Sequence, residues 1–163
     1  MKSSNPRINQ YTAQFITVYD GHPWYGDSIY EILGNITPAK VFWKPTETAH
    51  SIAEITSHMI YWRQALIKRL DGDIAYKASM KSEDNWKSND QLKRMGWKVL
   101  KKSLEESQTH LLSLLAKQKD AILKKKYSDT ATFQDVINGI LQHDLYHTGQ
   151  IAYLKSIYPN NKK

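Results

Sequence analysis

The 163-residue sequence contains no cysteine. This absence excludes a disulfide framework, a zinc–thiolate site and a cysteine nucleophile, so any metal ion must be bound by nitrogen and oxygen atoms. The sequence also lacks a run of roughly 18 apolar residues, the length that a membrane span requires. Residues 1–10 are polar and do not show the basic and then apolar order of a secretion signal. We therefore expect a cytoplasmic protein with no membrane partner.

The composition is that of an ordinary globular chain. Hydrophobic residues make up 40% and charged residues 24% of the sequence, unlike the polar, highly charged composition of disordered proteins. A single hydrophobic core serves roughly 100–200 residues. No internal repeat and no stretch rich in glycine, serine or proline divides the sequence. We therefore expect one domain that covers residues 1–163.

Basic residues outnumber acidic ones, which gives a formal net charge of +7. Such an excess could attract nucleic acid or anionic substrates by Coulomb forces. The lysines gather in three clusters: Lys98, Lys101 and Lys102; Lys117, Lys119, Lys124, Lys125 and Lys126; and Lys162 and Lys163. These clusters lack the interleaved aromatic residues on which nucleic-acid bases stack. A solvated basic surface is therefore favoured over a nucleic-acid partner.

Apolar residues recur at helical spacing and no strand-like alternation is present, which predicts an all-α four-helix bundle. The first helix is predicted over Arg7–Tyr19, with a break near Pro23 and a continuation over Trp24–Gly34. Thr37-Pro38 is expected to open a short turn of helix, and Val41–Thr48 is expected to be a loop.

The second helix is predicted to begin after Ser51. Glu54 follows three residues later and completes a capping-box pattern, in which the two side chains bind backbone N–H groups at the start of the helix. The apolar period then continues to Leu70. The polar and irregular segment Ile74–Asn89 is expected to be a long loop.

The third helix is predicted to be long, from Leu92 to near Lys119. A connection over Tyr127–Thr132 leads to the last helix, for which Thr132 is the predicted N-cap. Asp135 favours this start electrostatically, and Pro159 ends the helix.

Three histidines lie on apolar helix faces. His143 and His147 are four residues apart in the last helix, so they share one face of it. That face is otherwise apolar and consists of Val136, Ile140, Ile151 and Leu154. His58 lies in the apolar stripe of the second helix, among Ile52, Ile55, Met59, Trp62 and Leu66. All three imidazoles are therefore predicted to point into the bundle.

Burying three imidazoles without partners would cost roughly 1–3 kcal/mol for each orphaned polar group. A lone histidine on an apolar face is usually a hydrogen-bonded core residue, and a helical pair four residues apart also arises by chance. The addition of His58 from another helix favours a metal site. We predict that His58, His143 and His147 bind one divalent metal ion and leave a coordination position open. Imidazole ligands suit zinc, nickel, iron or copper rather than magnesium or calcium, and we expect zinc or nickel.

Other polar residues near these helices allow more than one role. Asp144 could orient an imidazole, cap a neighbouring helix or form a surface ion pair. His22 and His50 lie at helix entrances, where a place at the pocket mouth competes with loop packing, and loop packing is favoured for both. His110 has no partner by spacing and is expected to be structural.

Several segments in this order resemble the DinB-like (damage-inducible) family. They are WYGDS at residues 24–28 with Leu33, HSIAEI at 50–55 running to His58 and Trp62, RLDG at 69–72, Asp84 with Trp86, and GILQHDLYHTGQI at 139–151. The last segment is the most specific of them. Asn85 separates Asp84 from Trp86, whereas these two residue types are expected to be adjacent in close relatives. The path of that loop is therefore left open.

The resemblance implies a metal-binding four-helix bundle in which His58, His143 and His147 are the metal ligands. It also implies a homodimer. The family is a scaffold for several chemistries, which include thiol S-transferases that use bacillithiol, mycothiol or glutathione, and metal-dependent hydrolases. It does not imply a DNA polymerase, because neither a polymerase motif nor an adequate length is present.

The sequence thus predicts a metal-dependent enzyme, a transferase or a hydrolase, for a small-molecule substrate such as a low-molecular-weight thiol. A zincin protease is excluded, since no helix contains the His-Glu-x-x-His pattern. No catalytic residue other than the metal ligands is indicated. The alternative is a non-catalytic, metal-stabilised binding or sensor module that contacts nucleic acid through its basic surface.

Overall fold

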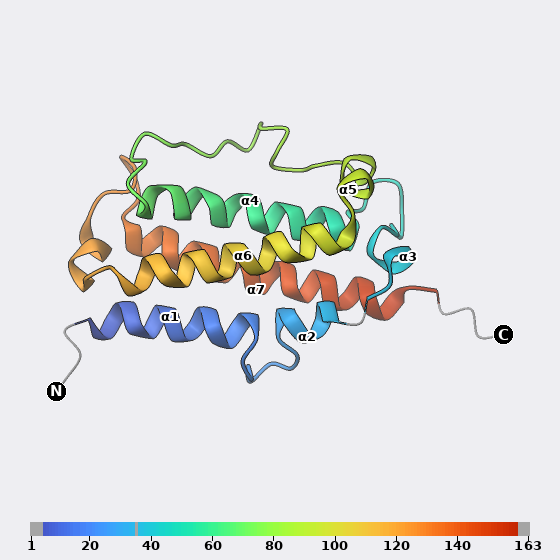
Figure 1. Ribbon diagram of the computed structural model, residues 1–163, viewed down its shortest axis with the longest axis horizontal. Coiled ribbons are helices and arrows are strands. Elements are labelled where there is room, and N and C mark those ends of the chain that lie inside the picture. The colour runs from blue at the N-terminus through green and yellow to red at the C-terminus, as the bar shows by residue number, and fades with distance from the viewer. Residues whose placement is uncertain (1–4, 35, 160–163) are drawn as a thin grey trace.

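The computed structural model describes residues 5–34 and 36–159, and they form an all-α fold. Long helical rods lie side by side (Figure 1). The helices are α1 (Pro6–Tyr19), α2 (Ile29–Gly34), α3 (Pro38–Val41), α4 (Ile52–Leu70), α5 (Asn89–Met95), α6 (Trp97–Ala116), the 3₁₀ helix η1 (Asp120–Lys124) and α7 (Phe133–Ile157). The predicted all-α fold class is confirmed, and so is the break in the first helix.

The direction of the rods follows from one long crossover. Helices α1, α2 and α7 run from the end near the N-terminus to the end near the C-terminus, and α4 and α6 run the other way (Figure 1). Since α4 and α6 are parallel, residues 71–88 must return along the whole length of the bundle to connect them. This segment, which we call the crossover loop, passes over α4 (Figure 1). The predicted long loop at 74–89 is confirmed except for Asn89, which is the first residue of α5.

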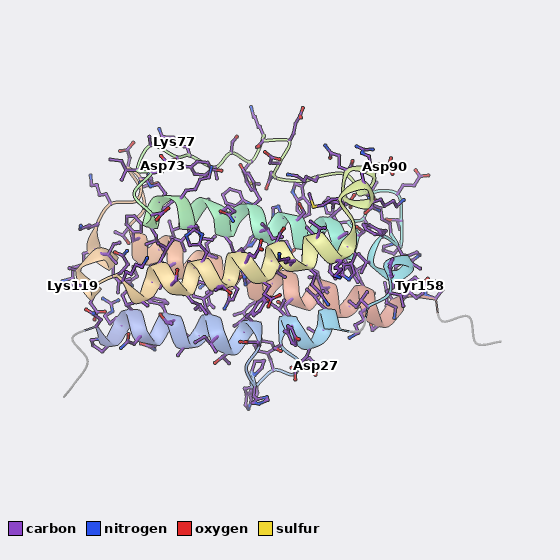
Figure 2. All side chains as sticks on the ribbon, viewed as in Figure 1. Asp27, Asp73, Lys77, Asp90, Lys119 and Tyr158 are labelled. Atoms are coloured by element: carbon purple, nitrogen blue, oxygen red, sulfur yellow. The ribbon has the colours of Figure 1, made fainter. Side chains whose placement is uncertain are left out.

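The core lies between α1, α4, α6 and α7. Its fully buried side chains come from all four rods and include Phe15, Met59, Leu66, Leu111 and Ile137. Charged side chains such as Asp73, Lys77, Asp90 and Lys119 project from the loops and ends of the bundle (Figure 2). In the described residues, no helix combines the length and the apolar character needed to cross a bilayer.

Local capping signals place three helix starts where the sequence predicted them. Ser51 accepts a hydrogen bond from the backbone N–H of Glu54, and the Glu54 carboxylate accepts one from the backbone N–H of Ser51, as predicted. Thr132 and Asp135 form the same reciprocal pair at the start of α7. The short helix α3 begins at Pro38 behind the N-cap Thr37, again as predicted.

Two predicted helices differ from the structure. The continuation of the first helix begins at Ile29 rather than Trp24, because Ser28 and Glu31 cap it and Trp24 lies fully exposed in the preceding loop. The predicted third helix is two helices, α5 and α6. Gly96 separates them with a φ of +87°, a backbone conformation that glycine adopts without the steric cost other residues pay.

The start of α1 depends on a residue far away in the sequence. Asp120, the first residue of η1, accepts hydrogen bonds from the backbone N–H groups of Arg7 (3.1 Å) and Ile8 (2.9 Å). Asp120 therefore acts like an N-cap side chain for α1, although it lies 112 positions from Ile8 and 113 from Arg7 in the sequence. The helical turn at Asp120–Lys124 lies between the predicted end of the third helix and the predicted connection, and the sequence did not predict it.

Candidate metal centre

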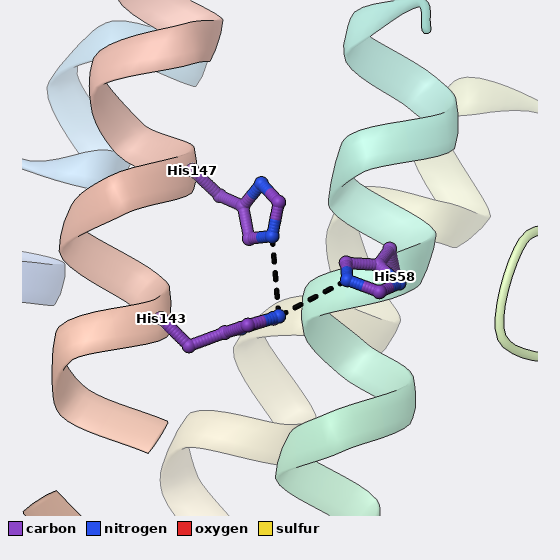
Figure 3. A group of neighbouring side chains, drawn as sticks. All are labelled: His58, His143 and His147. Atoms are coloured by element: carbon purple, nitrogen blue, oxygen red, sulfur yellow. Dashed lines mark hydrogen bonds between the residues drawn. The ribbon is translucent and has the colours of Figure 1, made fainter. Parts of the chain in front are cut away.

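The three predicted histidines lie together between α4 and α7 (Figure 3). His58 points from α4 towards α7, while His143 and His147 point back from successive turns of α7. The Nε2 atom of His143 is 3.0 Å from Nε2 of His58 and 3.1 Å from Nε2 of His147. The three ligand atoms lie within 4.8 Å of one another, which is the geometry of a shared ligand site.

The outer hydrogen bonds of two of these rings fix their tautomers. Nδ1 of His58 lies 2.9 Å from the backbone oxygen of Asn85, and Nδ1 of His147 lies 2.6 Å from Oε1 of Gln150. Because both partners are acceptors, we assign the ring proton to Nδ1 in each case. The Nε2 lone pairs of both rings then face Nε2 of His143. This outer shell is typical of metal-ligating histidines.

A cation fits this arrangement better than hydrogen bonds do. His143 Nε2 can donate one proton at most, so it cannot satisfy two facing lone pairs at once. Its own Nδ1 is buried and has no hydrogen-bond partner among the described residues. A tetrahedral ion with metal–nitrogen distances of about 2.0–2.1 Å would place the Nε2 atoms roughly 3.3 Å apart, close to the separations observed. The cluster therefore supports a divalent metal site.

Burial keeps the imidazoles neutral, which is the form that binds a metal ion. Desolvation lowers the pKa of His58 and of His147 below its usual value. The pKa of His143 falls to about 3, first because of burial and then because of repulsion by His147, His58 and Arg63. The site is thus ready to bind a cation at neutral pH without first losing protons.

The same pKa shifts predict a pH-dependent stability of the metal-free protein. An unfolded histidine takes up a proton near pH 6.5, whereas folded His143 does so only at about pH 3. The unfolded state therefore binds more protons across this interval, so the free energy of unfolding should fall as the pH is lowered from about 6.5 towards 3. Urea unfolding of chelator-treated protein at pH 7 and at pH 5 measures this fall in the free energy of unfolding. The His143→Asn variant should lose part of this pH dependence, and an unchanged dependence would contradict the assignment.

Trp86 of the crossover loop covers one side of the cluster. Its ring is stacked on His58, with centroids 3.8 Å apart, and on His50, with centroids 3.7 Å apart, each at 7° between planes. Two imidazoles this close to one indole cannot share a face without clashing, so Trp86 lies between them. The crossover loop therefore supplies both the ring that covers His58 and, through Asn85, the acceptor for its Nδ1 proton.

Glu54 ties His50 to the start of α4. Its carboxylate lies 3.4 Å from Nδ1 of His50 and 2.9 Å from Nζ of Lys44. It also accepts the backbone N–H of Asn89 at 3.1 Å, which holds the start of α5 against α4. The predicted capping residue therefore also connects the mouth of the site to the helix that follows the crossover loop.

Asp144 forms an ion pair inside the bundle, which differs from each of the three roles considered for it. Its Oδ2 atom accepts a hydrogen bond from Nε of Arg63 (2.8 Å) and lies 2.7 Å from Nη2 of the same guanidinium. Both side chains are completely buried. Burial raises the pKa of the Asp144 carboxyl, whereas the Arg63 guanidinium lowers it. Sequence reasoning missed Arg63, although it lies in the apolar stripe four residues after Met59 and three before Leu66.

The remaining histidines lie outside the cluster. His22 is exposed in the loop between α1 and α2, and His110 is exposed on α6. His50 is half-exposed, but it borders the site through Trp86 instead of packing only within its loop. His22 therefore does not reach the site, and the expectation of loop packing is incomplete for His50.

Two cavities flank the histidine cluster. One, of about 620 Å³, is lined by His58, Trp62, Met80, Trp86, Ala131, Asp135, Val136, Gly139, Ile140, His143, Tyr146 and His147. The other, of about 510 Å³, is lined by Pro45, Ala49, His50, Ile55, Trp86, Tyr146, His147, Gln150, Tyr153 and Leu154. They share Trp86, Tyr146 and His147. Both volumes fall in the range of small-molecule sites, roughly 300–1,000 Å³.

Comparison with models of known protein families gives a match. The family model described as the DinB superfamily matches residues 26–151, which is well over half of the chain and includes all three clustered histidines. No curated protein and no solved structure matches the chain.

Proposed function

Because the chain belongs to the DinB superfamily, we propose that it is a metal-dependent enzyme that acts on a small molecule. The observation that carries this proposal is the convergence of three Nε2 atoms from two helices beside a cavity large enough for a substrate. Three protein ligands without a fourth leave a position open, as in catalytic metal sites, whereas structural sites are closed by four protein ligands.

His58, His143 and His147 would hold the ion, for which zinc and nickel are the best candidates because the ligands are all imidazoles. When bound, such an ion lowers the pKa of a coordinated thiol or water and so provides a nucleophile near neutral pH. Asn85 and Gln150 orient two of the ligands through their Nδ1 protons. Trp86 shields one side of His58 from water.

The two flanking cavities favour transfer between two molecules over hydrolysis. Hydrolysis needs space for one organic substrate, since the second reactant is water. Here two cavities meet at Trp86, Tyr146 and His147. In the transfer that we propose, a low-molecular-weight thiol loses its S–H proton to solvent and its sulfur forms a bond to a carbon of the electrophile. The leaving group departs from that carbon with the electrons of the bond that breaks.

The test is an activity screen on purified protein loaded with zinc or nickel. It combines 1-chloro-2,4-dinitrobenzene as the electrophile with bacillithiol, mycothiol, glutathione or cysteine, and follows the coloured thioether and the released chloride. We expect one thiol to be consumed far faster with the loaded protein than with chelator-treated protein. Turnover that persists without metal would contradict the proposal. Hydrolysis of ester substrates without any thiol transfer would favour a hydrolase. The absence of both activities would favour a non-catalytic binding module.

A further inference from the structure

The larger cavity beside the histidines has mainly apolar walls. We propose that it binds an uncharged aromatic group of the substrate, so that the reactive end of that molecule faces the histidine cluster. This inference rests on the proposed function for the reaction, but the binding itself depends only on the cavity. Its walls come from α4, the crossover loop, α7 and, through Ala131, the connection that precedes α7.

Apolar side chains dominate these walls. Trp62 comes from α4, Met80 and Trp86 come from the crossover loop, and Val136 and Ile140 come from α7. Met80 lines the cavity but is 70% exposed to solvent, so this apolar side chain lies at the mouth of the cavity. Apolar walls around a few polar groups at one end are typical of small-molecule sites. Here the polar end is formed by the three histidines.

The charge at the rim disfavours an anionic group. Asp135 is the one charged residue, histidines apart, among the described residues that line this cavity. Hydrogen bonds from the Thr132 hydroxyl and backbone N–H lower the pKa of its carboxyl, so it stays negatively charged at neutral pH. No lysine or arginine of the described lining offsets it. A carboxylate or phosphate held beside Asp135 would meet its negative charge, whereas the positive charge of a bound ion would lie at the histidine end of the cavity.

The orientation of the indoles favours an aromatic ligand over an alkyl chain. Both faces of Trp86 are covered, by His50 and His58, so a ligand in the cavity meets the edge of this ring. Trp62 stands at 77° to the ring of His58 and at 65° to the ring of His143, so these rings meet in T-shaped contacts. The positive edge of an aromatic ring attracts the negative face of another, so the edge of Trp86 suits a ligand that offers a ring face.

Gly139 gives a direct way to fill the cavity. It lies on α7 in the lining, and a Cβ atom added there would meet no atom within 4 Å. The Gly139→Leu substitution should therefore occupy the cavity without straining the helix. Gly149 provides the matched control, because it also lies on α7 with free space for a Cβ but lines a different cavity with Tyr25 and Asp27.

The experiment is calorimetric titration of the metal-loaded full chain with 2-naphthol and with naphthalene-2-sulfonate, an anion of similar shape that is a weak metal ligand. We expect 2-naphthol to bind at least about tenfold more tightly, and Gly139→Leu to weaken it about tenfold or more, as loss of a buried aromatic contact would. Gly149→Leu should leave its Kd within about twofold of the parent value. Circular dichroism checks that both variants fold.

A second variant tests the role of charge. Asp135→Asn keeps an oxygen for the Thr132 hydrogen bonds but removes the negative charge, so it should improve sulfonate binding several-fold and leave 2-naphthol unchanged. Equal affinity of the two probes in the parent, or unchanged 2-naphthol binding in folded Gly139→Leu, would overturn the inference. Metal bound without 2-naphthol binding would refute this inference alone. Binding of 2-naphthol by a protein that takes up no metal would refute the proposed enzyme alone.

Discussion

The His143→Ala variant is expected to lose its divalent metal. The Nε2 atom of His143 lies between those of His58 and His147, so its removal leaves two ligands from different helices. Loss of an outer hydrogen-bond partner alone weakens metal affinity by about 10–100-fold, so loss of the ligand should weaken it by more than about 100-fold. Elemental analysis after dialysis against a competing chelator measures the bound metal.

His110→Ala is the matched control for this variant. His110 is exposed on α6, away from the cluster, so its replacement should leave the metal content unchanged. The comparison separates a specific site from adventitious binding to surface histidines. Near-stoichiometric metal in His143→Ala would show that the cluster does not bind the ion. A parent protein that stays metal-free after reconstitution with zinc and with nickel would lead to the same conclusion.

Breaking the buried ion pair should produce the largest loss of stability. In Arg63→Met the Asp144 carboxylate keeps its complete burial but loses its counter-ion. Removing one partner of a buried pair typically costs about 3–5 kcal/mol, a large part of the roughly 5–15 kcal/mol that stabilises a domain. We therefore expect a much lower free energy of unfolding for Arg63→Met, measured by urea denaturation.

The double variant Arg63→Met/Asp144→Leu distinguishes the cost of an orphaned charge from the value of the pair. Replacing both partners by apolar residues is often neutral or better, so the double variant should recover most of the lost stability. Lys102→Met is the control, because Lys102 pairs with Glu106 at the surface, where ion pairs contribute little. A double variant as unstable as Arg63→Met would show that local packing is responsible.

The sequence predicted the histidine cluster because helical periodicity determines which way a side chain points. His58, His143 and His147 each occupy an apolar stripe, and two packed amphipathic helices must bring such stripes together. The same logic applies to Arg63 and Asp144, two opposite charges in apolar stripes of different helices. A search for charged residues in those stripes would have found this pair.

Other features could not be predicted in this way, because they depend on contacts between distant segments. Trp86 and Asn85 reach His58 only because the crossover loop returns along α4, and no local pattern determines that path. Asp120 caps α1 across the whole bundle. By contrast, the break at Gly96 and the capping box of Ser88 with Gln91 were readable local signals, which the apolar period of the predicted third helix concealed.

The histidine cluster joins positions that are far apart along the chain. His58 and His143 are separated by 85 positions. Bringing the ends of so long a segment together in an unfolded chain costs about 4–5 kcal/mol of conformational entropy in a loop-closure model. Because α4 packs against α7 around the apolar core, the free energy of coordination would not have to meet this cost alone. A peptide with the α7 histidines alone would offer only two ligands.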